Sequence, residues 1–272
     1  MVLTLNEAPR MRKCLSSLAR NCDKVVVIDS FSTDDTLAEA ERVWKSLDRE
    51  AEDLILVTRV WKGFVEARNS SLDWVSTEWV LWVDADEWIM DDFCEALKHL
   101  EKLPRELSIF KVARQSYFLG RAIRFGGWYP DRKARLARTQ NCVWKAGPKG
   151  AEVHEDLFER ESGLRDDSSA AWIAGHLGHE GFRSIEEQEE TNEKYSTLLA
   201  EGAAKELKRL GKSPPNALLR CVKPWLKFVE NYLWKLGILD GYPGFVIARG
   251  SARSLKLRLE KISQFVGEAE KE

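Results

Sequence analysis

The sequence predicts an α/β fold, in which an open, mostly parallel sheet flanked by helices is followed by a helical region at the C-terminus. The first reason is that short apolar runs alternate with helix-like amphipathic stretches over residues 1–104, which is the pattern of βαβ units. The second reason is that residues 183–272 lack such runs and are mainly helical in pattern. A chain of 272 residues, 44% of them hydrophobic, is also long enough to bury a substantial core.

Four apolar runs are predicted to form the strands of this sheet: residues 2–5, 24–30, 53–58 and 79–83. They are almost continuously apolar, as expected of strands that are buried on both faces of a parallel sheet. Helices are expected over a stretch that contains Met11, Leu15 and Leu18, and over residues 36–47, 64–76 and 91–100. The pattern loosens after residue 105, where residues 108–113 are a further predicted strand.

The composition limits the class of partner and the compartment. A formal net charge of −2 gives no reason to expect nucleic-acid binding. The five cysteines form no CxxC pair and are odd in number, which favours free thiols in a reducing compartment. Neither a secretory signal nor a transmembrane-length apolar run is visible. The sequence therefore indicates a cytoplasmic protein whose contact with a membrane, if any, is peripheral.

Polar residues follow three of the predicted strands. Asn6 and Glu7 follow the first, Asp29 follows the second, and the sequence DADE follows the fourth. In open α/β sheets ligands bind beyond the carboxyl ends of the strands, so these groups are expected to converge at one edge. Two roles are open for Asp29, which either caps the next helix or accepts a hydrogen bond from a nucleotide base or ribose.

The stretch WVLWVDADEW places Asp84, Asp86 and Glu87 directly after an apolar run. Carboxylates this close repel one another unless a cation offsets their charge. Asp84 and Asp86 share one side of an extended chain, and such a pair suits Mg²⁺ or Mn²⁺ whose other ligands are water and substrate phosphates. The alternative is a solvated acidic turn that caps the next helix. The position after a strand, near the loop of Asp29, favours the metal site.

Longer segments carry a resemblance to a known family. Five segments occur in this order: NEAPRMRKCLSSL, VVVIDSFSTDDT, WKGFVEARNSSLDWVSTEWVLWVDADE, GGWYPDRKARLAR and VHE. Two further segments follow them: HLGHEGFRSIEEQEETNEKYS and KPWLKFVENYLWKLGILDGYPGFVIA. Together they resemble the family 2 glycosyltransferases of the Rossmann-like GT-A fold, and most nearly the bacterial lipopolysaccharide core β-1,4-glucosyltransferase subgroup. One departure is that this chain opens almost inside its first strand, where the family has a few more residues.

The resemblance implies an inverting, metal-dependent enzyme that moves a hexose such as glucose from a UDP-sugar to a lipopolysaccharide-core or related glycolipid acceptor. It implies a GT-A domain over residues 1–182, with a nucleotide-sugar half (1–104) and an acceptor half (105–182), and then a separate region (183–272). It places Mg²⁺ or Mn²⁺ at Asp84 and Asp86. The nucleotide-sugar contacts that it implies are Asn6, Glu7, Asp29, Arg68, Asn69 and Asp84.

Inverting transfer also needs positive charge that stabilises the departing diphosphate. Arg132, Lys133 and Arg135 lie in the segment GGWYPDRKARLAR and supply such charge, and Arg135 is the nucleotide-sugar contact that we expect from this group.

The acceptor hydroxyl must lose its proton to a base as it attacks. The candidate bases are Glu155, Asp131, Glu87 and His154. We choose Glu155, because it follows a short apolar strand and because the resemblance places the VHE segment where an acceptor enters, and we rank Asp131 second. Three roles stay open for His154: a third metal ligand, a group that orients Glu155, or a structural histidine.

Two further pairs of side chains are candidates. His176 and His179 have the spacing of a metal pair on a helix, but the glycines around them argue against a helix, so structural or acceptor-side roles are expected. Trp128 and Tyr129 are a candidate acceptor platform, because aromatic rings pack on the C–H faces of sugars. Ordinary core packing is the alternative for both aromatics.

The C-terminal region is basic, with thirteen Lys or Arg and four Asp or Glu in residues 205–261. Two amphipathic stretches with cationic flanks, 217–236 and 252–266, are expected to form helices. Such helices lie on anionic bilayers, so a position on the inner face of the cytoplasmic membrane is expected. The alternative is that their apolar faces pack on the catalytic domain or on a second copy of the chain in a homo-oligomer.

Two other functions are compatible with these residues. A metal-dependent nucleotidyltransferase also pairs a cation with carboxylates, but no glycine-rich phosphate loop with a following Lys lies near the first strand. A catalytically degenerate scaffold that binds sugar or nucleotide at a membrane surface is the other alternative. The intact DADE and VHE sequences speak against it.

Overall fold

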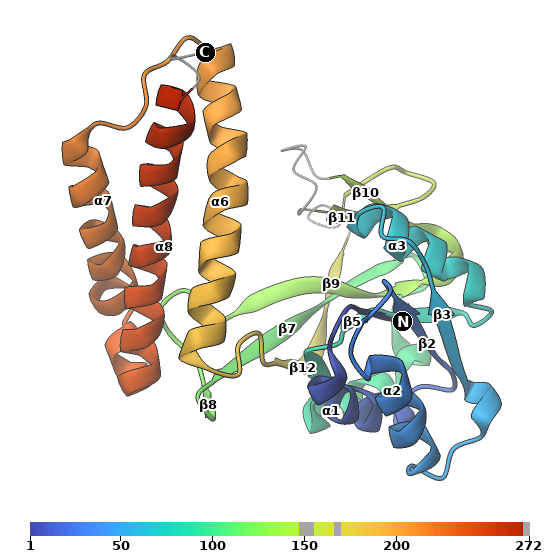
Figure 1. The fold of residues 1–272 in the computed structure, drawn as a ribbon. Helices are drawn as coiled ribbons and strands as arrows, with labels where there is room; N and C mark the ends of the chain where they lie inside the picture. Colours follow the sequence, from blue (N-terminus) through green and yellow to red (C-terminus); the bar gives the residue numbers. More distant parts are fainter. Residues whose placement is uncertain (147–154, 166–169, 269–272) are drawn as a thin grey trace. The chain divides into compact units, whose positions relative to one another are not determined.

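The computed structural model describes residues 1–146, 155–165 and 170–268, and these form two compact units (Figure 1). Unit 1 comprises Met1–Arg114 and Asp131–His179, and unit 2 comprises Gln115–Pro130 and Glu180–Glu272. Unit 1 contains most of the strands, and unit 2 contains the long C-terminal helices. The predicted α/β class, with a parallel sheet and a helical C-terminal region, is confirmed.

The parallel sheet of unit 1 has four strands in the order β3-β2-β1-β5. Their bounds are β1 Val2–Thr4, β2 Val25–Asp29, β3 Leu54–Thr58 and β5 Val83–Asp84. In the parallel register Thr4 lies opposite Asp29, and Leu3 lies opposite Asp84. The carboxyl ends of β1, β2 and β5 therefore meet at one edge, as the polar residues after these runs predicted.

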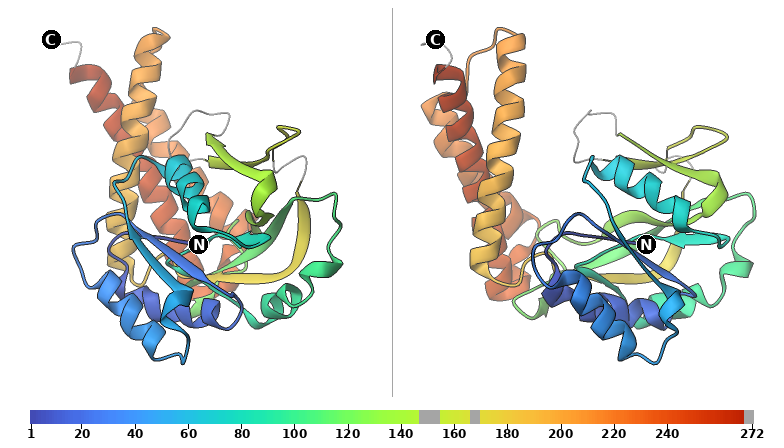
Figure 2. Two further views of the ribbon diagram at one scale, coloured as in Figure 1. Left: turned by 90° about the vertical axis from the view of Figure 1, so that its right-hand side faces the viewer. Right: turned by 45° about the vertical axis from the view of Figure 1, so that its right-hand side comes forward.

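Helices cover both faces of this sheet. The α-helices among the described residues of unit 1 are α1 (Ala8–Ala19), α2 (Thr36–Lys45), α3 (Phe64–Ser71) and α4 (Asp91–Leu97). Figure 2 shows α1 and α2 on one face and α3 on the other. Successive residues of β2 point to opposite faces, so Val25 and Val27 join one core and Val26 and Ile28 join the other. Burial on both faces explains why the predicted strands are apolar throughout.

A second sheet lies in the order β4-β9-β7-β12-β6, with β8 paired to β7. In it β9 pairs antiparallel with both β4 and β7, and β12 pairs antiparallel with β6. Its strands are β4 Trp79–Leu81, β6 Glu87–Ile89, β7 Ile109–Phe118, β8 Arg121–Ala122, β9 Asp131–Arg138 and β12 Ala171–His179. β10 (Cys142–Ala146) and β11 (Glu155–Glu159) form a separate antiparallel pair. In the first sheet, by contrast, all three strand pairings are parallel.

The predicted strand at residues 79–83 is divided between the two sheets. β4 pairs antiparallel with β9, whereas β5 pairs parallel with β1. Between them, the fully buried Trp82 donates its backbone N–H to the carbonyl of Arg135 in β9 (2.8 Å). This crossing brings the end of β5, and with it the DADE sequence, beside β9.

One glycine allows β12 to approach α4 closely. Gly175 has a φ of +99°, and a Cβ at this position would lie 2.4 Å from the Cα of Phe93. The obstacle is backbone, which cannot swing aside as a flexible side chain does.

We expect Gly175→Ala to lower the free energy of unfolding by about 3 kcal/mol, measured by urea denaturation. Gly63→Ala is the matched control, because Gly63 has the same φ and no atom within 4 Å of a Cβ. Equal losses in both variants would contradict the close-contact explanation.

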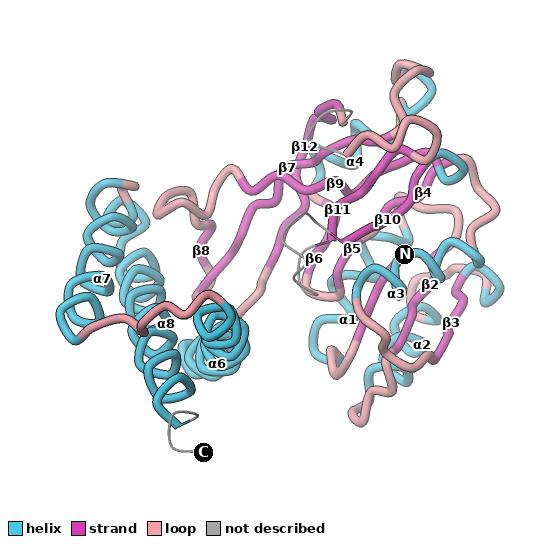
Figure 3. The backbone as a smooth tube through the Cα atoms, turned by 90° about the horizontal axis from the view of Figure 1, so that it is seen from above, coloured by secondary structure: helices cyan, strands magenta, loops and turns pink. Residues whose placement is uncertain are grey.

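Unit 2 is built on three long helices: α6 (Ile185–Arg209), α7 (Ala217–Val229) and α8 (Gly241–Glu268). α8 lies between α6 and α7 (Figures 1 and 3). A π-helical turn (Glu230–Trp234) and a 3-10 helix (Gly237–Asp240) connect α7 to α8. No helix in the described residues carries an apolar run long enough to cross a bilayer.

The second predicted amphipathic stretch, residues 252–266, uses its apolar face inside unit 2. Ile262 and Val266 of α8 are buried and pack with Ala200 and Ala204 of α6. The expectation that this face is available to a bilayer is therefore wrong. The first stretch, residues 217–236, differs and is considered below with its exposed side chains.

Candidate active site

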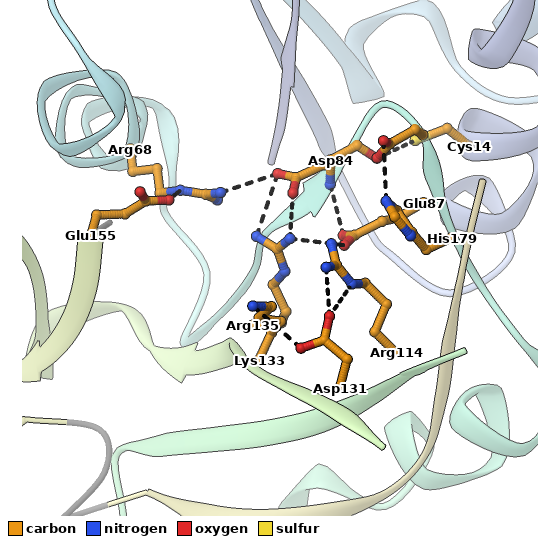
Figure 4. Close-up of polar contacts among 11 residues, drawn as sticks. Cys14, Arg68, Asp84, Glu87, Arg114, Asp131, Lys133, Arg135, Glu155 and His179 are labelled. Atoms are coloured by element: carbon orange, nitrogen blue, oxygen red, sulfur yellow. Dashed lines mark hydrogen bonds and ion pairs between the residues drawn. The ribbon is translucent and has the colours of Figure 1, made fainter. Parts of the chain in front are cut away.

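Asp84, at the end of β5, is the centre of a network of ion pairs in unit 1 (Figure 4). Arg68 of α3 donates to its Oδ1 (3.1 Å), and Arg135 of β9 contacts both of its carboxylate oxygens. Burial alone would raise the pKa of Asp84, but the charges of Arg135 and Arg68 outweigh it and hold the pKa well below its usual range. The carboxylate is therefore ionised at neutral pH, and 32% of the side chain is still exposed.

Glu87 holds the buried side of this network. Its side chain is fully buried, and it accepts from Arg135 (2.8 Å), from Arg114 (3.2 Å) and from the backbone N–H of Asp84 (3.0 Å). A carboxylate without exposure cannot take a proton from a bound acceptor. Among the four candidate bases, Glu87 is therefore excluded, and its role is to fix the two arginines.

Asp131 lies at one end of the network. Arg114 contacts its Oδ2 at 2.5 Å, and Lys133 contacts its Oδ1 at 3.3 Å. Burial would raise the pKa of Asp131, but Arg114 and Lys133 outweigh this and lower it. A carboxylate with a lowered pKa is a weaker base. Asp131, which we ranked second among the candidate bases, is therefore less suited to proton abstraction in this environment.

Glu155 lies at the other end, at the start of β11. Its Oε1 accepts from Arg68 Nε (3.1 Å), and 14% of its side chain is exposed. Arg68 also stacks on the ring of Trp144, with its guanidinium carbon 4.7 Å from the ring centroid. Asn69 fixes the backbone of Trp144 from the neighbouring position in α3, donating to its carbonyl (2.8 Å) and accepting from its N–H (2.9 Å). Arg68 therefore links Glu155 directly to Asp84.

Asp86 contacts His179, for which the sequence analysis expected a structural or acceptor-side role. Its Oδ2 lies 3.3 Å from Nε2 of His179, at the end of β12, and both side chains are partly exposed. A carboxylate and an imidazole at the solvent edge fit one divalent cation whose remaining ligands come from phosphate and water. The described residues contain no group of three or more His, Cys, Asp or Glu side chains able to hold a metal. His154 lies outside the described residues.

The loop after β1 is built by the predicted nucleotide-binding residues themselves. Asn6, at φ +58°, accepts from the backbone N–H of Thr33 (2.8 Å). Asp29 is buried and accepts from the backbone N–H of Ser32 (2.9 Å). The backbone N–H of Glu7 donates to Thr36 Oγ1 (2.8 Å). These contacts hold the edge of the sheet in shape, and direct contacts of Asn6, Glu7, Asp29 and Asn69 with a nucleotide stay predictions.

His176 and Trp128 have partners of their own. His176 contacts Asp92 of α4 through Nδ1 (2.5 Å), so the two histidines of β12 have different carboxylate partners, as a strand rather than a helix would give. Trp128 and Tyr129 belong to unit 2. There Trp128 packs with Phe182 at a centroid distance of 6.3 Å, which fits the core-packing alternative.

The sequence analysis missed Arg114 as a member of the site, and it did not foresee that His179 pairs with Asp86. Arg114 pairs with both Glu87 and Asp131, and it ends the alternating segment SIFKVAR. Its position on a strand with the cations of GGWYPDRKARLAR nearby in sequence was the available signal. His179 was noticed only as part of a histidine pair.

A DxD sequence at the end of a parallel strand, joined through Arg68 to Glu155, lies where open α/β sheets bind their ligands. Residues 1–145 match the family described as Glycosyl transferase family 2, and the chain belongs to this family. It is therefore a glycosyltransferase of the EC 2.4 class.

The chain is similar to particular members along nearly its whole length. It is 28% identical over 268 residues to the lipopolysaccharide core biosynthesis glycosyltransferase LpsC of Rhizobium meliloti, covering 97% of this chain and 90% of LpsC. It is 24% identical to an uncharacterized glycosyltransferase of Rickettsia felis, covering 97% and 88%. The mannosyltransferase PcManGT from Pyrobaculum calidifontis, solved with GDP-Man and Mn²⁺, aligns with a TM-score of 0.50 and 16% identity, over 96% of this chain and 85% of that chain. The structural likeness supports the GT-A fold.

Proposed function

We propose that this protein transfers a hexose, and specifically glucose, from a UDP-sugar to a lipopolysaccharide-core or related glycolipid, with inversion at the anomeric carbon. The observation that carries the proposal is the single ion-pair network that joins Asp84 to Glu155 through Arg68. Membership of family 2 supports the use of a nucleotide sugar, and the similarity to LpsC supports the class of acceptor.

In this proposal Glu155 is the general base. The acceptor hydroxyl forms a bond to the anomeric carbon, its proton passes to Glu155, and the bond from that carbon to the diphosphate oxygen breaks. Within the described residues only Oε1 of Glu155 is engaged, by Arg68, so Oε2 is the oxygen that we assign to the proton. Arg68, held by Trp144 and Asp84, orients the carboxylate for this step.

In this proposal Asp86 and His179 would hold Mg²⁺ or Mn²⁺. Asp84, the other metal ligand predicted from the DxD sequence, would contribute through the part of its side chain that is exposed. When bound, the cation supplies positive charge that stabilises the departing diphosphate. Because the two arginines already neutralise Asp84, we assign the larger share of cation binding to Asp86. The sequence analysis named Asp84 and Asp86 as metal ligands without ranking them.

Asp86→Asn is expected to weaken Mn²⁺-dependent UDP binding by about 10- to 100-fold, because the amide loses the negative charge that attracts the cation. Isothermal titration of UDP with and without Mn²⁺ measures it. Asp92→Asn is the matched control, since Asp92 contacts the other histidine of β12. Unchanged Mn²⁺-dependent UDP binding by Asp86→Asn would contradict the assignment.

The activity itself is tested by UDP release from UDP-glucose, with Mg²⁺ or Mn²⁺ and a glycolipid extract. Sugar transfer to the lipid supports the proposal. Donor binding without any turnover in the presence of the extract would instead favour a catalytically degenerate binding protein.

A further inference from the structure

The outer side of α7 is apolar and exposed to solvent. One side of α7 carries four apolar side chains at helical spacing: Leu218, Val222, Trp225 and Leu226. The π-helical turn that follows extends this surface with Leu233 and Trp234. We call these six residues the α7 apolar surface. Trp225 is 64% exposed and Trp234 is 81% exposed. Monomeric proteins rarely leave a contiguous apolar surface of this kind without a partner.

Within unit 2, the described residues pack on one side of α7 and leave the α7 apolar surface open. Its opposite side carries Pro224, which is buried, and Phe228, which is partly buried. The ring of Phe228 lies 5.9 Å from that of Phe245 in α8. α8 lies between α7 and α6, so α6 does not reach α7 (Figures 1 and 3). Among the described residues of unit 2, no helix covers the α7 apolar surface. This distinguishes α7 from α8, whose apolar side packs on α6.

Cations accompany this surface. Four cationic residues lie on α7 or just after it: Arg220, Lys223, Lys227 and Lys235. The same segment contains one acidic residue, Glu230. Lys227 and Lys235 both pair with Glu230, at 3.1 and 2.5 Å. For Arg220 and Lys223 the described part of the chain contains no ion pair. The border of the α7 apolar surface is therefore net positive.

We propose that the α7 apolar surface binds an anionic lipid bilayer, with its Trp and Leu side chains in the interfacial region and its cations at the lipid phosphates. A helix with Trp and Leu on one side and Lys or Arg beside them is the pattern of interfacial helices. Trp prefers the membrane–water interface. Three of the four cations are Lys, which is depleted in protein–protein interfaces, so the composition favours lipid over a protein partner.

The test is flotation of the full chain with vesicles, without donor or acceptor, so its outcome is independent of the proposed transferase activity. We expect binding to phosphatidylglycerol–phosphatidylcholine vesicles and much weaker binding to pure phosphatidylcholine. Trp225→Ser with Trp234→Ser is expected to weaken partitioning at least about tenfold. Arg220→Glu with Lys223→Glu is expected to weaken it about tenfold on anionic vesicles, and high salt should mimic this variant.

Tyr195→Ser with Leu198→Ser is the matched control, since both residues are exposed apolar side chains of α6. Its binding should equal that of the wild type. Equal binding by the Trp double variant, or no binding of the wild type to anionic vesicles, would overturn the proposal. A dimer in solution that the Trp double variant converts to a monomer, with no vesicle binding, would identify the surface as a subunit interface and also overturn it.

Discussion

Glu155→Gln is expected to reduce sugar transfer by about 10²- to 10⁴-fold while UDP binding stays within a few fold of the wild type. The amide keeps the shape of the carboxylate and still accepts a hydrogen bond from Arg68, but it cannot take a proton from the acceptor hydroxyl. A single-turnover assay with radiolabelled UDP-glucose and glycolipid extract measures the transfer step, and titration with UDP measures binding separately.

Two comparisons make this test specific. Asp156→Asn changes the next residue of β11, whose carboxylate contacts Arg165 at 3.3 Å, and should leave transfer near the wild-type rate. Asp131→Asn addresses the second-ranked base, and its effect on the transfer step should be smaller than that of Glu155→Gln. If the order is reversed, with Glu155→Gln nearly active and Asp131→Asn inactive, our assignment of the base is wrong.

Arg135→Met is expected to lower the free energy of unfolding by about 3–5 kcal/mol, since it leaves two carboxylates facing each other without their shared cation. Arg135 is almost fully buried and contacts both Asp84 and Glu87. Methionine fills similar volume, so the loss reports charge rather than a cavity. Urea denaturation followed by tryptophan fluorescence measures it, and a loss below about 1 kcal/mol would contradict the account.

Arg42→Met is the matched control, because Arg42 forms an exposed ion pair with Glu39 in the same unit. Its cost should stay within about 1 kcal/mol. Adding Glu87→Gln to Arg135→Met should recover part of the stability, because it removes one of the two carboxylates that shared Arg135.

The dependence of stability on pH gives a further signature of Arg135. Because the folded pKa of Asp84 lies below its unfolded value, this group stabilises the wild type above the unfolded pKa, and the contribution is lost as pH falls toward the folded pKa. That loss on acidification should be smaller in the Arg135→Met variant, in which Asp84 retains Arg68 and Arg114 but has lost the arginine that lowers its pKa most.

Much of the site follows from local sequence. The strand that ends at Asp29 and the DADE sequence after an apolar run are recognisable because a buried parallel strand must be apolar and its ligand-facing end polar. The structure brings four predicted site residues into one network with Asp84: Arg68, Arg135, Glu155 and Asp131. What was not predictable was how they are connected.

The pairing of Glu87 with both Arg114 and Arg135 joins positions 27 and 48 residues apart, and no periodicity indicates such a contact. The same limit applies to the run at residues 79–83. Its apolar side chains predict a strand, but which neighbours each half pairs with depends on chain segments far away in sequence. Likewise, Asp86 and His179 meet only because β6 and β12 pair.

The sequence by itself determined the α/β class, the polar edge of the parallel sheet and the two amphipathic C-terminal stretches, because local hydrophobic patterns specify which side chains must be buried. Only the tertiary structure decided what each apolar side is buried against. The apolar side of α8 packs on α6, whereas that of α7 has no cover within the described residues of unit 2. The physical reason is that burial requires a partner surface, and the partner is chosen by the packing of the whole chain rather than by the residues of one helix.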